Sequence, residues 1–139
     1  MGMALSLGRR GLGRVWPNPN VGCVVVKDGR VLGRGWTADG GRPHAEAVAL
    51  DMAGVNAIGS TAYVTLEPCA HHGKTGSCAL ALVNAGIARC VVAAHDPDDR
   101  VAGKGIQILR DAGISVDVGC LQNAANEDHK GFFYRVIHG

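Results

Sequence analysis

Aromatic residues are scarce in this 139-residue sequence, because Phe, Trp and Tyr together make up only 4% of it. Large rings cannot therefore dominate a core, and Val, Ile, Leu and Ala must fill it. Apolar residues still account for 47% and charged residues for 19%, which is typical of a packed globular protein and argues against disorder. Glycine, in contrast, occurs 21 times. Many tight turns and a small-residue core favour an α/β layer protein.

Long hydrophobic runs are also absent. No stretch approaches the roughly 20 apolar residues that cross a bilayer, and the N-terminus lacks an apolar segment followed by a cleavage site. We therefore expect a cytoplasmic protein with no membrane partner. Clustered basic charge is missing as well, since the net charge is +2 and Arg9-Arg10 is the only adjacent basic pair. We do not expect nucleic acid as a partner.

A complete set of paired cysteines is missing too. Five cysteines cannot all pair within one chain, and in a cytoplasmic protein this number indicates metal binding or buried thiols rather than a disulfide framework. Cys23 and Cys90 lie within β-branched runs, where a thiol usually acts as a small core residue.

Hydrophobic periodicity and turn residues predict one domain over residues 1–139, with alternating strands and helices. Strands are expected at 21–27, 31–36, 62–66, 89–94 and 114–118, and helices near 3–7 and at 44–53, 78–84, 105–112 and 121–137. Asp28-Gly29 should turn the first two strands into a hairpin. The later strand-helix-strand order indicates parallel pairing, so we expect a three-layer α/β/α sandwich around a mixed five-stranded sheet.

Three potential zinc ligands and one carboxylate carry the chemistry. His44 and Glu46 fall in the first turn of a predicted helix, and Cys69 and Cys78 supply two soft sulfurs near a second helix start. One imidazole and two thiolates leave the fourth tetrahedral position open for water, as a catalytic zinc requires. Zinc lowers the pKa of bound water toward 7, and Glu46 can move the proton to a departing amine. We expect one zinc per chain and hydrolysis of an amine.

Several motifs, in order, carry a resemblance to a known family. They are Asn18-Pro19-Asn20-Val21-Gly22, His44-Ala45-Glu46, Thr65-Leu66-Glu67-Pro68-Cys69, His71-His72-Gly73-Lys74-Thr75, Asp96-Pro97 and Val101-Ala102-Gly103-Lys104-Gly105. Eight residues separate Cys69 from Cys78, unlike the short Cys-x-x-Cys spacing of most zinc nucleobase deaminases. Over nearly its whole length the chain resembles the deaminase domain of the bifunctional riboflavin-biosynthesis deaminase/reductase.

This resemblance implies a cytidine deaminase-like fold and a specific reaction. Such domains remove the ring amine of 2,5-diamino-6-ribosylamino-4(3H)-pyrimidinone 5′-phosphate, giving the pyrimidinedione and ammonia. Asn18, Lys74 and Asp96 match substrate-pocket positions, and His71 or His72 is expected to touch substrate or orient its loop rather than bind the metal. The resemblance also implies a homo-oligomer and a reductase, as a further domain or a separate protein, that acts next in the pathway.

Three departures from the family pattern limit what carries over. Thr37 stands where the family often has histidine, and Gly76-Ser77 replaces two prolines. The chain also stops at Gly139, before a reductase domain could follow, so it is either an excised domain or a stand-alone deaminase. Two alternatives stay open: another nucleobase, nucleotide or tRNA adenosine deaminase of the same fold, or a non-catalytic module stabilised by zinc, for which Glu46 would have no use.

Overall fold

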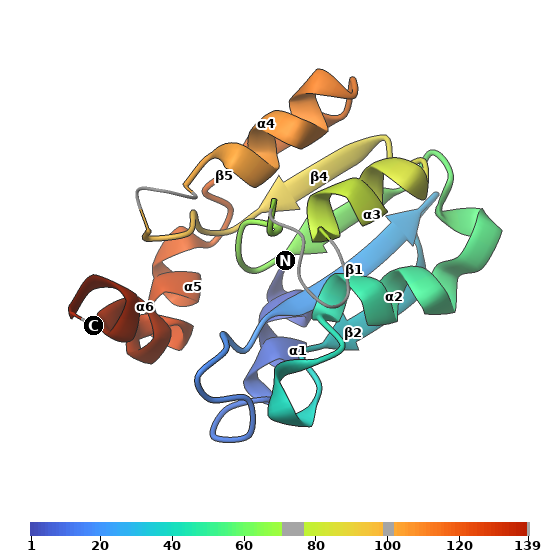
Figure 1. Ribbon diagram of the computed structural model, residues 1–139. Helices are drawn as coiled ribbons and strands as arrows, with labels where there is room; N and C mark the ends of the chain where they lie inside the picture. The colour runs from blue at the N-terminus through green and yellow to red at the C-terminus, as the bar shows by residue number, and fades with distance from the viewer. Residues whose placement is uncertain (71–76, 99–101, 139) are drawn as a thin grey trace.

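A five-stranded mixed sheet forms the centre of the computed structural model, which describes residues 1–70, 77–98 and 102–138. Its strands are β1 (Gly22–Lys27), β2 (Arg30–Trp36), β3 (Thr61–Val64), β4 (Arg89–Val92) and β5 (Ser115–Val118), in the order β2-β1-β3-β4-β5 (Figure 1). Strand β1 is antiparallel to both β2 and β3, whereas β3, β4 and β5 are parallel. The predicted hairpin and the predicted mixed sheet are confirmed.

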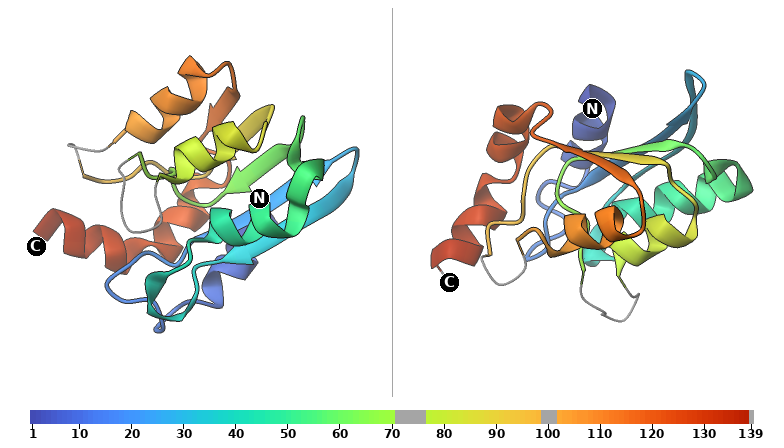
Figure 2. Two further views of the ribbon diagram at one scale, coloured as in Figure 1. Left: turned by 45° about the vertical axis from the view of Figure 1, so that its right-hand side comes forward. Right: turned by 90° about the horizontal axis from the view of Figure 1, so that it is seen from above.

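Helices cover both faces of the sheet. They are α1 (Gly2–Arg9), α2 (Ala45–Ala53), α3 (Cys78–Asn84), α4 (Lys104–Asp111), α5 (Gln122–Asp128) and α6 (Lys130–His138), with short 3-10 turns at Asp39–Gly41 and Gly54–Ala57. Seen from above, α2, α3 and α4 lie on one face and α1 and α5 on the other (Figure 2). The expected three layers are therefore present. Among the described residues, no helix is both long and apolar enough to span a membrane.

The C-terminal segment differs from the single helix expected over 121–137. Helix α5 ends at Asp128, its C-cap His129 (φ −98°, ψ 4°) departs from helical geometry, and α6 starts at the next residue. His129 is buried, and its Nε2 lies 3.3 Å from Oγ1 of Thr65. This contact joins residues 64 positions apart. Because periodicity reports only neighbours along the chain, it could not predict the break.

The strands β3 and β4 are shorter than predicted at their carboxyl ends. The sequence predicted strands to residues 66 and 94, but the ladder stops at Val64 and Val92. Beyond it, the amide of Glu67 still donates to the carbonyl of Ala94 at 2.9 Å, so the two segments remain together as they leave the sheet. Residues that follow these strands are therefore placed side by side at one edge.

Small residues in β2 let α2 lie unusually close to the sheet. A Cβ atom at Gly33 would collide with the carbonyl oxygen of Ala49, and one at Gly35 would lie 2.6 Å from the carbonyl oxygen of Ala45. Both partners are backbone atoms of α2, which cannot rotate away as a side chain could. The glycines of β2 thus set the distance between the sheet and the start of α2.

Cys23 and Cys90 are core residues, as predicted. Both are fully buried in the sheet as free thiols. Burial raises the pKa of Cys90 to about 12 and that of Cys23 well above its usual value, because a thiolate loses its hydration there. These two cysteines are therefore neutral packing residues at physiological pH.

Gly33→Ala should destabilise the fold through the clash with α2. We expect the free energy of unfolding to fall by about 1–3 kcal/mol, the usual range for overpacking. Gly131→Ala is the matched control, since a Cβ there meets nothing within 4 Å and alanine favours the helix by about 0.5–1 kcal/mol. Urea unfolding measures both changes, and equal stability of the two variants would contradict the close-packing argument.

Buried His129 predicts a loss of stability in acid. Burial lowers the pKa of His129 because the charged ring loses water, whereas the unfolded chain binds a proton near pH 6.5. The stability that neutral His129 contributes is thus present above about pH 6.5 and is lost as the pH falls below it.

We expect the free energy of unfolding of the wild type to fall by up to about 1.4 kcal/mol per pH unit more than that of His129→Gln between pH 6.5 and 5. Glutamine does not titrate but can still bond Thr65. Denaturant titrations at several pH values measure the difference, and parallel pH profiles of the two proteins would refute it.

Candidate functional site

The start of α2 carries two of the predicted site residues. His44 is the N-cap of this helix, with an extended backbone, and so lies one position before the helix that the sequence placed it in. Glu46 lies in the first turn, as predicted, and is only 4% exposed. The two side chains therefore leave the helix end close together, one half-buried and the other enclosed.

The two cysteines meet where α3 begins. The amide of Cys78 lies 3.3 Å from Sγ of Cys69, and the hydroxyl of Ser77 donates to the carbonyl of Cys69 at 2.9 Å. The same Ser77 oxygen accepts from the amide of Leu80 at 3.3 Å and so caps α3. Ser77 thus links Cys69 to α3, the helix that starts at Cys78.

His44, Cys69 and Cys78 converge on one point. Their ligand atoms all lie within 4.8 Å of one another, and Nδ1 of His44 lies 3.2 Å from Sγ of Cys78. In a tetrahedral zinc site with Zn–S near 2.3 Å and Zn–N near 2.0 Å, neighbouring ligand atoms are about 3.4–3.8 Å apart. The donor set and its spacing fit one zinc ion, and within the described residues no other such group occurs.

Hydrogen bonding among these side chains shifts their titration. The bond from Cys78 lowers the pKa of Cys69 to about 4, while donating that bond raises the pKa of Cys78. The contact with Cys69 also raises the pKa of His44. Cys69 is therefore the readiest thiolate, the form in which sulfur binds metals.

Glu46 is enclosed beside this group. Burial raises its pKa to about 7, because the carboxylate loses its hydration, and the nearby Cys69 thiolate adds to the shift. A carboxyl group with a pKa near neutrality can both accept and donate a proton under physiological conditions.

A cavity of about 240 Å³ opens beside the ligand group. It is lined by Asn18, Pro19, Val21, Thr37, Arg42, His44, Glu46, Leu66, Glu67, Cys69, Asp96 and Phe132. These residues converge because the start of β1 and the ends of β2, β3 and β4 share one edge of the sheet. Two of the predicted substrate residues, Asn18 and Asp96, thus lie on the cavity wall. The other two, His71 and Lys74, lie outside the described residues, as does His72.

Sequence reasoning missed several lining residues. Thr37 was noted only as a departure, yet its hydroxyl donates to the carbonyl of Pro19 at 3.1 Å and accepts from the amide of Val21 at 3.0 Å. It therefore supports the segment that carries Asn18. Arg42 and Phe132 gave no motif signal, and Phe132 arrives from α6, far along the chain. Glu67 could have been suspected, because it lies within the Thr65–Cys69 motif.

Comparisons with known proteins agree with this geometry. Residues 1–94 match the family described as the cytidine and deoxycytidylate deaminase zinc-binding region. The riboflavin biosynthesis protein RibD of Haemophilus influenzae is 50% identical over the whole chain, which covers 37% of that protein. A diaminohydroxyphosphoribosylamino-pyrimidine deaminase of Buchnera aphidicola is 45% identical, and there the chain covers 95% of its relative.

A solved structure of RibD from Acinetobacter baumannii superposes with a TM-score of 0.95 at 51% identity, over 97% of this chain and 38% of that one. The chain thus spans under two fifths of the length of its RibD relatives. The expected resemblance and the cytidine deaminase-like fold are confirmed. One zinc ion is confirmed as the cofactor by the zinc-binding family match and by the converging ligand group.

The ligand set can be tested by metal content. We expect about one zinc per wild-type chain, and near-complete loss in Cys69→Ser and in Cys78→Ser, because each removes a thiolate donor. Cys120→Ser is the matched control, since Cys120 is an exposed free thiol outside the group. Mass spectrometry of the metal measures the ratio. Full zinc content in a Cys69→Ser/Cys78→Ser double variant would reject these ligands.

Proposed function

Because the chain belongs to the cytidine and deoxycytidylate deaminase zinc-binding family, we propose that it deaminates a pyrimidine nucleotide of riboflavin biosynthesis. The substrate proposed is 2,5-diamino-6-ribosylamino-4(3H)-pyrimidinone 5′-phosphate, and the products are the 5-amino-6-ribosylamino-pyrimidinedione 5′-phosphate and ammonia. The names of the relatives support this choice, above all that of the Buchnera deaminase, which has nearly the same length as this chain.

One observation carries the proposal. Glu46, with a pKa near 7, lies buried beside His44, Cys69 and Cys78 and faces the cavity. A structural metal site has no need of an acid/base carboxylate next to an open coordination position. The arrangement therefore supports catalysis over the alternative of a non-catalytic module.

Hydrolytic deamination assigns a role to each residue. Zinc held by His44, Cys69 and Cys78 supplies, when bound, a Lewis acid that makes water nucleophilic near neutral pH. Glu46 accepts a proton from the attacking water at its carboxylate oxygen as the new C–O bond forms. The same carboxyl group then donates a proton to the departing amine as the C–N bond breaks. Ammonia leaves, a carbonyl remains on the ring, and the second proton of the water ends on the adjacent ring nitrogen.

The cavity wall suits recognition of the substrate. Asn18 carries both a donor and an acceptor, which match a ring amide, and Gly41 leaves room for its side chain, because a Cβ atom at Gly41 would collide with Nδ2 of Asn18. Asp96 can accept a hydrogen bond from a ribose hydroxyl. Lys74 and His71 are proposed as further substrate contacts on the family pattern alone.

Other expectations stay predictions. The RibD relatives are longer than this chain, and a related structure from Thermotoga maritima is titled a deaminase/reductase. A reductase, fused or separate, is therefore proposed to act on the product. A homo-oligomeric state and a cytoplasmic location rest on the resemblance and the composition.

A tRNA adenosine deaminase structure shares 27% identity, and the sequence carries no clustered basic charge, so this alternative is not favoured.

The test is ammonia release from the proposed substrate, compared between the wild type and Glu46→Gln. We expect turnover by the wild type and a fall in kcat of at least about 100-fold in the variant, because an amide cannot shuttle the proton. Zinc content and the unfolding midpoint should stay near those of the wild type. Asp51→Asn is the matched control, since this carboxylate is exposed on the same helix.

Two outcomes would be informative against the proposal. Wild-type kcat in Glu46→Gln would exclude the proton shuttle. A zinc-loaded wild type that releases no ammonia from this substrate, but does so from cytidine or deoxycytidylate, would move the assignment to another deaminase of the family.

A further inference from the structure

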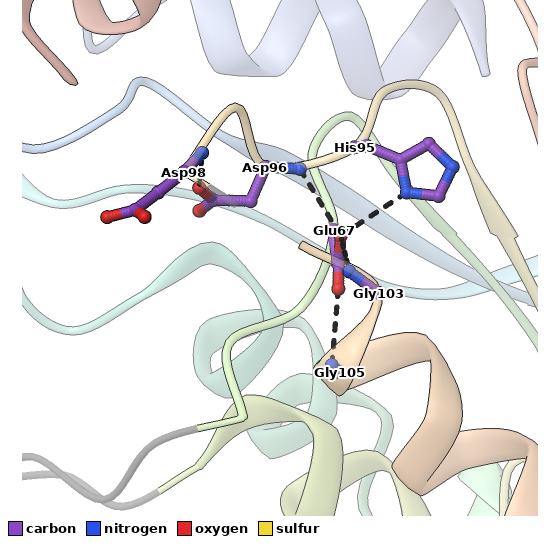
Figure 3. Close-up of polar contacts among 6 residues, drawn as sticks. All are labelled: Glu67, His95, Asp96, Asp98, Gly103 and Gly105. Atoms are coloured by element: carbon purple, nitrogen blue, oxygen red, sulfur yellow. Dashed lines mark hydrogen bonds and ion pairs between the residues drawn. The ribbon is translucent and has the colours of Figure 1, made fainter. Parts of the chain in front are cut away.

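Glu67 lies at a junction that the proposed chemistry leaves unused. Its side chain is only 2% exposed. Its carboxylate accepts three backbone hydrogen bonds, from the amides of Asp96 (3.2 Å), Gly103 (3.0 Å) and Gly105 (3.2 Å), and Nδ1 of His95 lies 3.4 Å from it (Figure 3). A buried carboxylate with this many donors is fully satisfied.

These bonds replace a helix cap that the local sequence lacks. Gly103 is the N-cap of α4, has a positive φ of 82° and carries no side chain that could cap the helix. Glu67 accepts from the amides of Gly103 and Gly105 with its two different oxygens and so places a negative charge at the positive end of α4. The cap of α4 is therefore supplied by a residue 36 positions earlier.

The start of α4 also packs closely against Pro68, the residue that follows Glu67. A Cβ atom at Gly105 would collide with the carbonyl oxygen of Pro68, so only glycine allows this approach. Pro68 directly precedes Cys69, and Asp96 lines the cavity. The backbone around Glu67 thus connects a zinc ligand on one side with a cavity-lining carboxylate on the other.

We propose that Glu67 is a positioning residue that holds Asp96 at a set distance from Cys69, so that the substrate is bound in register with the zinc site. Glu67 acts through backbone amides rather than through the reacting atoms. The oxygen Oε1 accepts from the amides of both Asp96 and Gly103, so one atom fixes these two residues relative to each other. The inference rests on the proposed function for its kinetic readout only.

The first experiment compares Glu67→Gln with the wild type. Glutamine keeps the size of the side chain, but its NH₂ group faces amide donors where an oxygen stood. We expect KM to rise about tenfold and kcat to change less than about threefold, because substrate positioning is weakened while Glu46 and the metal ligands remain. Zinc content should be unchanged. Glu127→Gln is the matched control, since Glu127 is an exposed carboxylate on α5.

A double-variant cycle separates positioning from general stabilisation. If Glu67 acts through Asp96, Glu67→Gln should raise KM less than about twofold in an Asp96→Ala background. A merely structural role predicts that Glu67→Gln raises KM by the same factor in the wild-type and in the Asp96→Ala background. Equal factors, or a loss confined to kcat or to zinc content, would overturn the proposal.

Amide hydrogen exchange gives a readout that needs no substrate. The amides of Asp96, Gly103 and Gly105 should exchange faster in Glu67→Gln, while the amides of β1 stay protected. Unchanged exchange at these three amides would also overturn the proposal. If the wild type released no ammonia, the proposed function would fail on its own, and the exchange result would still decide whether Glu67 holds this segment.

Glu67→Asp covers the case in which the glutamine variant does not fold. Aspartate keeps the charge but shortens the reach, so it can serve fewer of the three amides. We expect a KM between those of the wild type and Glu67→Gln. Amide exchange should become faster at Gly105 before it does so at Asp96 or Gly103. A Glu67→Asp protein with the KM and the amide exchange rates of the wild type would contradict the proposed role of Glu67.

Discussion

Helix α2 lies so close to strand β2 that only hydrogen fits on the strand at Gly33 and Gly35. This approach places the start of α2, with the N-cap His44 and with Glu46, near Cys69, which follows β3. A bulkier strand would push the helix outward and separate the imidazole from the sulfurs. The site therefore depends on a packing distance that the glycines of β2 set.

Once enclosed, the site concentrates negative charge. Buried Glu46 lies next to a cysteine pair in which Cys69 readily becomes a thiolate. Two sulfurs and a carboxyl group in one enclosed site suit a divalent cation, because a bound ion is the largest local charge and stabilises thiolates. Burial thus has two consequences: it favours metal binding, and it brings the pKa of Glu46 into the range useful for proton transfer.

The cavity is assembled from segments that meet only in the folded chain. Asn18 precedes β1, Thr37 follows β2, Cys69 follows β3 and Asp96 follows β4, while Phe132 comes from α6. Antiparallel pairing of β1 with β2 and β3, together with parallel pairing of β3 with β4, brings these ends to the same edge. The hydroxyl of Thr37 and the carboxylate of Glu67 bond to backbone groups of these segments, so polar side chains help to shape the wall.

The sequence by itself predicted most of the elements and the residues that converge at the candidate zinc site. The Asp28-Gly29 turn, the β-branched strands and the spacing of His44, Glu46, Cys69 and Cys78 are local signals, readable from neighbours along the chain. Tertiary structure alone decided the helix break at His129, the position of Phe132 on the cavity wall and the capping of α4 by Glu67. Each depends on a contact between residues far apart in sequence, which no local pattern encodes, because burial and hydrogen-bond partners exist only after the sheet has formed.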